Sequence, residues 1–515
     1  MPCSHRMTLV PVQLSNPNLR RWAWILLLLL QVGAFARFLA GFQYLPGADA
    51  YYYALQTQSL LDCGHLKVPD DDLVHYLVAI VAHSGLSIET AFKTILTAIY
   101  AVYGLGFLLL LVRLKEKIQP MAALLWILSS GAIAFHAIEF PKLTLGLAMV
   151  PFWLWLMQST GTRRLLLLAL LLIVASFLHP LMAAWAVIFA CAMIVEYASA
   201  PGILLGSHKT LLAAFKGSVF FAAVLSIRLF ALGPRLVSLL QPAPPAILKL
   251  LWSPDIPYEM RLAISGFWVL LALWLAIYLV NKSFKKQYVI LSAATLALPL
   301  WPNHEPGLQD LGARLAAAFI FLALPLAAIL SNELAGQKLF VRLQLAWPQR
   351  VAVLLAIAEV TLLPIRLDRY HDILLTDDYV QYEKVVAALS RREIPMLIAH
   401  RGLDFFYTYR SRRDAFHFDP EANWNRSQIW RAATRITPEE LAYYSPPSCP
   451  WGETAGSIPG TGYVLVREDC WEHIRAAIKA DDNPDLFIEV WEDPENPSQP
   501  RPAFLRVRHG GPAGK

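Results

Sequence analysis

Residues 22–53 read WAWILLLLLQVGAFARFLAGFQYLPGADAYYY. The first part, residues 22–42, is one apolar stretch, and about 20 such residues cross the roughly 30 Å hydrocarbon layer of a bilayer. It runs into Asp49 and the ring-rich run Tyr51 to Tyr53. The string therefore predicts a membrane helix that ends beside an aromatic, acidic segment. A carboxylate at the lipid–water boundary suits chemistry on a polar substrate carried by a lipid, so Asp49 is the first candidate for a catalytic base.

The composition supports a membrane protein before any motif does. Hydrophobic residues make up 57% of the 515 residues and charged residues only 16%, with a mean hydropathy of +0.46. In soluble domains about a quarter of the residues are charged. The net charge of +6 is spread over loops without a polybasic tail. It therefore indicates membrane orientation and gives no sign of a nucleic-acid partner.

About eleven stretches have the length and character of membrane spans. Two of them form one apolar run that is broken by His179-Pro180, which we interpret as a tight turn because proline stops the preceding helix. Merging them into one span would reverse the side of everything that follows. The predicted spans are residues 22–42, 91–112, 120–137, 143–158, 165–179, 181–198, 211–232, 262–281, 287–301, 313–331 and 350–367.

The basic residues between the spans predict the orientation. If the turn at His179 is real, the basic clusters all fall on one side, which the positive-inside rule assigns to the cytoplasm. These clusters are Arg20/Arg21, Arg113/Lys115/Lys117, Arg163/Arg164, His208/Lys209, Lys282/Lys285/Lys286 and Lys338/Arg342/Arg350. The N-terminus is then cytoplasmic, and Asp49, His136, His179, the loop 302–312 and the C-terminal part face outwards. We expect a multi-pass protein of the bacterial inner membrane.

A cleaved signal peptide is the alternative interpretation of the first span, given the Ala-Phe-Ala at residues 34–36. The length of the apolar stretch and its continuation into the Asp49 segment favour a span. Near residue 368 the charge density rises and the apolar runs shorten to strand length, at residues 394–399, 463–466 and 504–507. We therefore predict a polytopic α-helical membrane domain over 1–368, with an outward loop at 43–90, and a soluble α/β domain over 369–515 with a frayed tail.

The outward loop is itself helical in pattern. Asp49 precedes a run without a helix breaker, so its simplest role is to cap that helix by accepting a backbone N–H. On such a helix Tyr52, Tyr53 and Gln56 share one face with Asp49. A second short helix, residues 73–83, is too short to span and is placed at the interface. The preceding Asp70-Asp71-Asp72 is better explained as a solvated cap than as a metal site.

Cysteines and cofactor motifs add little. Cys449 and Cys470 lie in the outward part, where an oxidising compartment would permit a disulfide. No zinc signature, P-loop or dinucleotide fingerprint occurs in the sequence. These patterns indicate no cofactor. They leave open whether a divalent cation takes part. Asn425-Arg426-Ser427 is a weak glycosylation sequon.

The order of these features resembles the GT-C superfamily of integral-membrane glycosyltransferases. The features are Pro46-Gly47-Ala48-Asp49-Ala50-Tyr51-Tyr52 after the first span, two juxtamembrane helices, the outward His179-Pro180, and Arg314 ahead of a proline-containing span. The similarity covers residues 20–370 as architecture. Members include protein mannosyltransferases, the aminoarabinose transferase of lipid A and the catalytic subunit of oligosaccharyltransferase.

The resemblance implies a sugar donor on a polyprenyl phosphate and an essential acidic residue in the first outward loop, which matches Asp49. The acceptor would be a glycan, a lipid or a protein. The family pattern often has a second acidic residue beside the first, whereas here the neighbours are Ala48 and Ala50. The second carboxylate is therefore unassigned, with Asp62, Asp70, Asp71, Asp72 and Glu139 as candidates.

The expected chemistry explains this set of residues. Nucleotide sugars are cytoplasmic, so an outward transferase needs a lipid-borne sugar, and direct displacement would invert the anomeric carbon. The base must reach the acceptor hydroxyl, and cationic groups must receive the charge that develops on the departing phosphate. Arg314 is the best cation because a guanidinium binds phosphate oxygens bidentately. The other candidates are Lys142, His136, His179 and His304.

Each candidate also has a plain structural explanation. Arg314 and Lys142 could snorkel to the headgroups, and His179 could bond a free carbonyl at a helix end. His136 could pair with Glu139, and His304 could be an ordinary loop residue. Tyr51 to Tyr53 could be interfacial belt aromatics. The rings and cations of residues 405–410 are better explained as core aromatics.

Other function classes stay open. A flippase or secondary transporter of lipid-linked sugars should show an internal repeat and broken helices at mid-membrane, and no repeat is evident here. A polysaccharide polymerase or ligase is a close variant of the transferase. A non-catalytic subunit of a cell-envelope complex is the remaining alternative.

Overall fold

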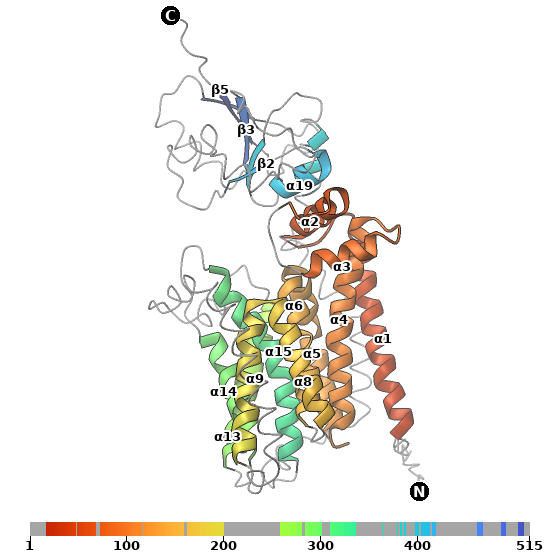
Figure 1. The fold of residues 1–515 in the computed structure, drawn as a ribbon, viewed down its shortest axis with the longest axis vertical. Helices are drawn as coiled ribbons and strands as arrows, with labels where there is room; N and C mark the ends of the chain where they lie inside the picture. Colours follow the sequence, from red (N-terminus) through yellow and green to blue (C-terminus); the bar gives the residue numbers. More distant parts are fainter. Residues whose placement is uncertain are drawn as a thin grey trace, which may run out of the picture. The chain divides into compact units, whose positions relative to one another are not determined.

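The computed structural model describes most of the helical part of the chain and separate segments of its last third. The described residues are 17–47, 49–67, 73–116, 118–158, 162–199, 258–280, 284–300, 309–335, 363, 379, 382–383, 386–387, 397–400, 403–412, 415–418, 461–466, 486–490 and 503–508. Figure 1 labels their helices and strands.

The chain divides into two compact units that alternate along the sequence. The first unit takes in Met1–Arg37, Ile99–Ala134 and Gly146–Arg366, and the second takes in Phe38–Ala98, Phe135–Leu145 and Leu367–Lys515. Because the units do not follow chain order, the two domains expected over 1–368 and 369–515 stay a prediction.

Three described helices are long and apolar enough to cross a membrane, judged by length and composition. They are α1 (Pro17–Gly41), α4 (Ile88–Arg113) and α5 (Gln119–Glu139). At 1.5 Å per residue, the 21 apolar residues from Arg21 to Gly41 are about 30 Å long. The first three predicted spans coincide with these helices and are confirmed as candidates.

The other described helices of this part are not among these three candidates. They are α6 (Pro141–Leu147), α7 (Val150–Met157), α8 (Thr162–Leu178), α9 (Pro180–Ser199), α13 (Tyr258–Leu279), α14 (Lys286–Ala297) with the 3₁₀ turn η2 (Leu298–Leu300), and α15 (Gln309–Leu334). The predicted span 143–158 is interrupted between α6 and α7. The spans 211–232 and 350–367 lie outside the described residues, apart from Leu363, so the count of eleven stays a prediction.

The turn at His179 is confirmed. α8 ends at Leu178, α9 begins at Pro180, and the two helices pack against each other (Figure 1). Proline fits the first turn of a helix because the N–H that it lacks has no intrahelical partner there.

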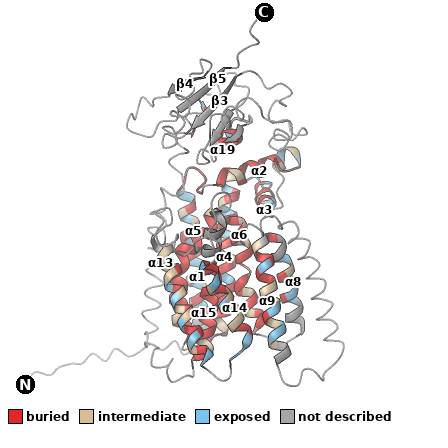
Figure 2. Cartoon of the chain, turned by 90° about the vertical axis from the view of Figure 1, so that its left-hand side faces the viewer, coloured by how far each residue is buried: buried red, intermediate tan, exposed pale blue. Residues whose placement is uncertain are grey.

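Helix α15 lies at the centre of the first unit. Its residues 318–331 are all buried (Figure 2), as expected of a helix that is apolar on every side. Pro325 lies inside it and has no N–H to donate to the carbonyl of Phe321 four residues earlier. The hydroxyl of Tyr103 on α4 donates to that carbonyl at 3.0 Å instead. The proline is therefore tolerated because a neighbouring helix supplies the missing donor.

The second unit holds two helices of the outward loop. α2 (Ala50–Cys63) and α3 (Leu73–Ala82) pack against each other, and Gly64 ends α2 in a left-handed conformation with φ of 76°. The end of α1 is anchored nearby, because the Lys93 ammonium on α4 donates to the carbonyl of Phe42 at 2.5 Å.

A five-stranded mixed sheet and one helix belong to the same unit. The strand order is β2-β1-β3-β5-β4, with β1 parallel to β2 and β3, and β5 antiparallel to β3 and β4. The strands are β1 (Leu397–His400), β2 (Ala415–Phe418), β3 (Thr461–Val466), β4 (Leu486–Val490) and β5 (Ala503–Arg508), and α19 (Leu403–Ser411) connects β1 to β2. Strands were expected at 394–399, 463–466 and 504–507, which overlap β1, β3 and β5.

Candidate active site around Asp49

Asp49 lies in a tight turn that begins α2. The carbonyl of Gly47 accepts the N–H of Ala50 at 3.2 Å, and Asp49 has φ −100° and ψ 10°, as in the third position of a type I turn. The carbonyl of Asp49 accepts the N–H of Tyr53 at 3.2 Å. Its half-buried side chain makes no capping hydrogen bond. The alternative that the Asp49 carboxylate caps the helix is therefore wrong, because the backbone alone starts α2.

The end of α5 lies directly behind this turn. Gly47 has a φ of 110°, and a Cβ atom built on it would stand 3.0 Å from the carbonyl oxygen of Ile138 and 3.6 Å from Oε1 of Glu139. Only glycine fits this conformation and this spacing. The close approach brings Glu139, distant in sequence, next to the turn that carries Asp49.

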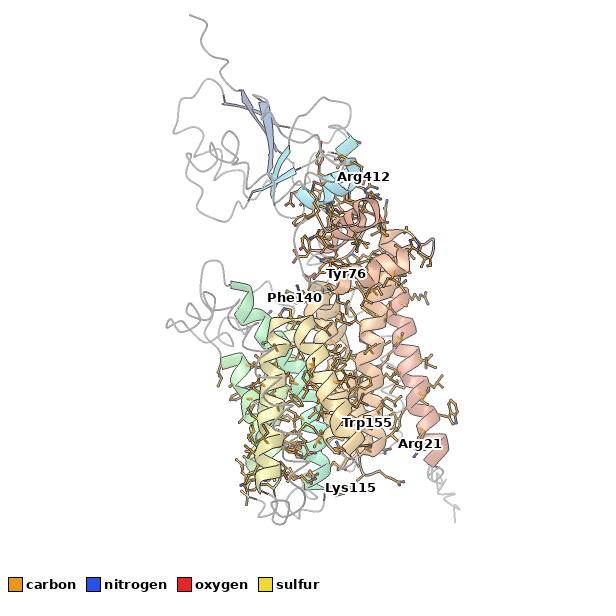
Figure 3. All side chains as sticks on the ribbon, in the orientation of Figure 1. Arg21, Tyr76, Lys115, Phe140, Trp155 and Arg412 are labelled. Atoms are coloured by element: carbon orange, nitrogen blue, oxygen red, sulfur yellow. The ribbon has the colours of Figure 1, made fainter. Side chains whose placement is uncertain are left out.

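The other described candidate for a second carboxylate lies elsewhere. Asp62, near the end of α2, accepts a hydrogen bond from the Arg412 guanidinium at 3.0 Å in an exposed ion pair; Figure 3 labels Arg412. Asp70, Asp71 and Asp72 lie outside the described residues. Glu139 is therefore the described candidate that adjoins the Asp49 turn.

A tyrosine from the last third of the chain also reaches the turn. The hydroxyl of Tyr379 donates to the carbonyl of Gly47 at 3.3 Å. Burial raises the pKa of Tyr379 well above its usual value, and the neighbouring tyrosines and the negative charges of Glu139 and Asp49 raise it further. The hydroxyl therefore stays protonated at neutral pH and can act only as a neutral hydrogen-bonding group.

The structure shows part of the polar and aromatic face that was predicted for α2. The Gln56 amide donates to the hydroxyl of Tyr52 at 3.0 Å, one turn away along the helix. The half-buried Tyr52 ring contacts Phe405, with centroids 5.1 Å apart. Tyr53 is 8% exposed and packs on His75 and Phe92. Tyr52 is therefore the accessible member of this face, whereas Gln56 is completely buried and Tyr53 is a core residue.

His136 is held in the interior at the junction of α5 and α6. It is completely buried, and its Nδ1 lies 2.7 Å from the hydroxyl oxygen of Thr144. That hydroxyl also lies 2.8 Å from the carbonyl oxygen of Phe140, the residue at the break between the helices. The contact ties α6 to the last turn of α5. Lys142 is half-buried on α6, three residues after Glu139.

The remaining predicted cations belong to the first unit. His179 caps α9, since its Nδ1 accepts the N–H of Leu181 at 3.1 Å. The ring nitrogen accepts from a donor at the start of a helix. The alternative offered by the sequence was a bond to a carbonyl at the end of a helix. Arg314 lies near the start of α15, and His304 lies outside the described residues. The roles of Arg314, Lys142, His136, His179 and His304 toward a substrate stay predictions.

Helix α19 packs its aromatic residues against α2. Phe406 and Tyr409 are buried against Tyr51, with centroids 4.7 and 5.4 Å away. The interpretation of this segment as core aromatics is thus confirmed. Burial raises the pKa of Tyr51 and of Tyr409. Arg410 lies 3.2 Å from Glu383 and 3.8 Å from Glu89, which anchors α19 to the start of α4.

The described cysteines include one disulfide-bonded residue that was not predicted. Cys63, the last residue of α2, is disulfide-bonded, and Cys191 is free and exposed. The predicted pair, Cys449 and Cys470, lies outside the described residues. In the described part of the chain, no cluster of three or more His, Cys, Asp or Glu side chains could hold a metal ion.

Comparison with known proteins shows the fold. No protein-family model matches the sequence, and no curated protein matches it. Two solved structures of ArnT from Cupriavidus metallidurans are similar. The apo structure has a TM-score of 0.54 at 11% identity and covers 95% of this chain and 98% of ArnT. The structure bound to undecaprenyl phosphate has a TM-score of 0.52 at 11% identity and covers 94% and 97%. The chain thus has, over nearly its whole length, the fold of ArnT.

Proposed function

We propose that this protein is a membrane glycosyltransferase that moves a sugar from a polyprenyl-phosphate donor to a hydroxyl group of a glycan, lipid or protein. The ArnT fold supports this class, and one of the two ArnT structures binds undecaprenyl phosphate. The observation that carries the proposal is the Asp49 turn. Its carboxylate is not used to cap α2, and a second carboxylate, Glu139, adjoins the same turn.

The proposed reaction is a direct displacement at the anomeric carbon. The acceptor oxygen forms a bond to that carbon while the bond between the carbon and the phosphate oxygen breaks. The bonding electrons leave with the phosphate, which yields polyprenyl phosphate, and the acceptor proton passes to Asp49. Half-burial leaves Asp49 near water, so it can later release the proton. Attack from the side opposite the phosphate inverts the anomeric configuration.

Glu139 and the cations complete the proposed site. We assign Glu139 as the second carboxylate, because its Oε1 would lie 3.6 Å from a Cβ atom at Gly47, in the turn that carries Asp49. The departing phosphate needs positive charge. Lys142, in the same unit as Asp49, is the proposed donor, and Arg314 stays a predicted one. Tyr52 offers a ring to the sugar, and the buried Gln56 amide holds the Tyr52 hydroxyl.

Several observations support an outward Asp49 and a cytoplasmic N-terminus. Arg21 precedes the apolar part of α1 and Asp49 follows it, so the two lie on opposite sides of a membrane that α1 crosses. Figure 3 shows Arg21 and Lys115 at the same end of the first unit, which is the pattern of a cytoplasmic side. The bonded Cys63 suits an oxidising compartment. The proposed location is the bacterial inner membrane.

The test is transfer by the full-length protein in proteoliposomes. Undecaprenyl phosphate carrying labelled aminoarabinose or mannose serves as the donor probe, and a cell-envelope extract supplies acceptors. We expect labelled product with inverted anomeric configuration by NMR. Asp49→Asn should abolish transfer, whereas Asp62→Asn, on the same helix but in an exposed ion pair, should keep it.

Two outcomes would contradict the proposal. Asp49→Asn with wild-type turnover would exclude Asp49 as the base. Movement of the intact labelled lipid from one leaflet to the other, without transfer of its sugar to any acceptor, would indicate a flippase instead. A product that grows by repeated addition would identify a polymerase within the same reaction class.

A further inference from the structure

One buried hydroxyl from the last third of the chain holds the turn that presents Asp49. The carbonyl of Gly47 receives two donors: the N–H of Ala50 at 3.2 Å within the turn, and the hydroxyl of Tyr379 at 3.3 Å from outside it. The first bond closes the turn. The second ties the turn to a residue more than 300 positions later in the sequence.

The direction of the Asp49 side chain depends on this turn. Asp49 is the third residue of the four that the Gly47–Ala50 hydrogen bond closes, and its own side chain makes no capping bond that would fix it to α2. Rotation of the Gly47 peptide would therefore move the Asp49 carboxylate. Ile138 packs closely against Gly47 on one side, since even an added Cβ at Gly47 would lie 3.0 Å from its carbonyl oxygen. Tyr379 restrains the carbonyl itself.

The Tyr379 ring is rigid enough for this role. It is completely buried. It stacks on Phe406 with centroids 5.2 Å apart and an interplanar angle of 24°, and it meets Tyr51 edge-on at 4.6 Å. Phe406 belongs to α19, which Arg410 anchors to Glu383 and Glu89. The hydroxyl therefore cannot move away from Gly47 without repacking several rings.

We infer that Tyr379 is a positioning residue for the Asp49 carboxylate, so that the segment after residue 367 is part of the catalytic unit. This inference rests on the proposed function. The electrostatic surroundings agree with it, because the charges of both Asp49 and Glu139 act on the Tyr379 hydroxyl. The hydroxyl bonds the turn and contributes no proton to the reaction.

The experiment compares Tyr379→Phe with Tyr409→Phe. Each variant removes one buried hydroxyl from the same cluster of rings. The Tyr409 hydroxyl bonds Glu89 and does not touch the turn. With the donor probe, we expect Tyr379→Phe to lower kcat about 10- to 100-fold, the effect of a misplaced catalytic group. KM for the donor should change less than about twofold and the thermal midpoint should match that of Tyr409→Phe, because uniform binding and packing are retained.

Hydrogen exchange provides a second measurement that needs no turnover. In Tyr379→Phe, the peptide covering residues 45–55 should take up deuterium faster than in the wild type, since the turn that orders the N–H of Ala50 is loosened. In Tyr409→Phe the same peptide should be unchanged. Equal exchange in wild type and Tyr379→Phe, or equal kcat in the two tyrosine variants, would overturn the inference.

The two proposals can fail separately. Loss of activity in Asp49→Asn with full activity in Tyr379→Phe would retain the transferase and remove the positioning role. Faster exchange at the turn in Tyr379→Phe, together with no sugar transfer by the wild type, would retain the restraint by Tyr379 and remove the transferase.

Discussion

Gly47 lies so close to Ile138 that a Cβ atom at position 47 would stand 3.0 Å from the Ile138 carbonyl oxygen. The end of α5 and the Asp49 turn are therefore in direct backbone contact. Any side chain at position 47 must separate them. This relationship is what brings Glu139 to the turn, and it makes Gly47 the most sensitive position of the candidate site.

Gly47→Ala should lower both stability and activity. The left-handed conformation costs an alanine about 1–2 kcal/mol, and the crowding against Ile138 adds about 1–3 kcal/mol. Gly64→Ala is the matched control, because Gly64 also has a positive φ but nothing lies within 4 Å of its Cβ position. Thermal unfolding in detergent measures the difference. Equal midpoints for the two variants would show that the contact with Ile138 carries no strain.

The His136–Thr144 contact should stabilise the junction of α5 and α6. Thr144→Val keeps the shape of the side chain but removes the oxygen that lies 2.7 Å from the buried ring nitrogen. We expect a loss of about 1–3 kcal/mol, the cost of an unmet buried polar group. Thr97→Val removes only a bond to the carbonyl of Lys93 on its own helix and should cost less. Thermal midpoints compare the two, and an equal loss in both would assign the effect to the local helix.

Helix α3 should lie in the membrane interface with one apolar edge towards lipid. Leu73, Tyr76 and Ile80 recur at helical spacing and are 41, 42 and 69% exposed, whereas Val74 and Val78 are fully buried. Such a helix with two apolar faces suits the headgroup boundary. A nitroxide on Ile80→Cys, in a Cys191→Ser background, should be more accessible to oxygen than to a water-soluble nickel complex. The same label on Arg412→Cys should show the reverse, and water-like accessibility at position 80 would contradict the placement.

Cys63 and Cys191 should differ in reactivity. In protein denatured in detergent without reductant, maleimide should modify Cys191, and Cys63 only after reduction, because Cys63 is disulfide-bonded and Cys191 is free. Peptide mass spectrometry of the non-reduced digest measures this directly. Ready labelling of Cys63 before reduction, in protein prepared from intact cells, would contradict both the disulfide and the outward placement of α2.

Local patterns predicted the helices well and their interruptions poorly. The apolar stretches that became α1, α4 and α5 and the break at His179-Pro180 were predicted, because apolar length and proline act within a few residues. The interruption between α6 and α7 was missed, although Pro151 stands at its edge. The surrounding sequence there is uniformly apolar, so hydropathy does not distinguish one helix from two.

Single residues near the site also show which features the sequence predicts and which it leaves undecided. The position of Asp49 just after α1 was predicted from the order of residues alone. The sequence also allowed its side chain to cap α2, because aspartate is a favoured N-cap. Only the geometry of the turn in the structure excluded the cap role. Glu139 was one of five candidates for the second carboxylate and could not be preferred on local grounds.

The amino-acid order alone determined that the chain crosses a membrane and that an acidic residue follows the first crossing, since both depend on apolar length along one segment. The tertiary structure decided which distant groups meet that acid. Glu139 and Tyr379 reach the turn through the close approach of a glycine and the packing of aromatic rings from separate segments. Such contacts arise from how surfaces fit together in space, and no periodicity within a single helix encodes them.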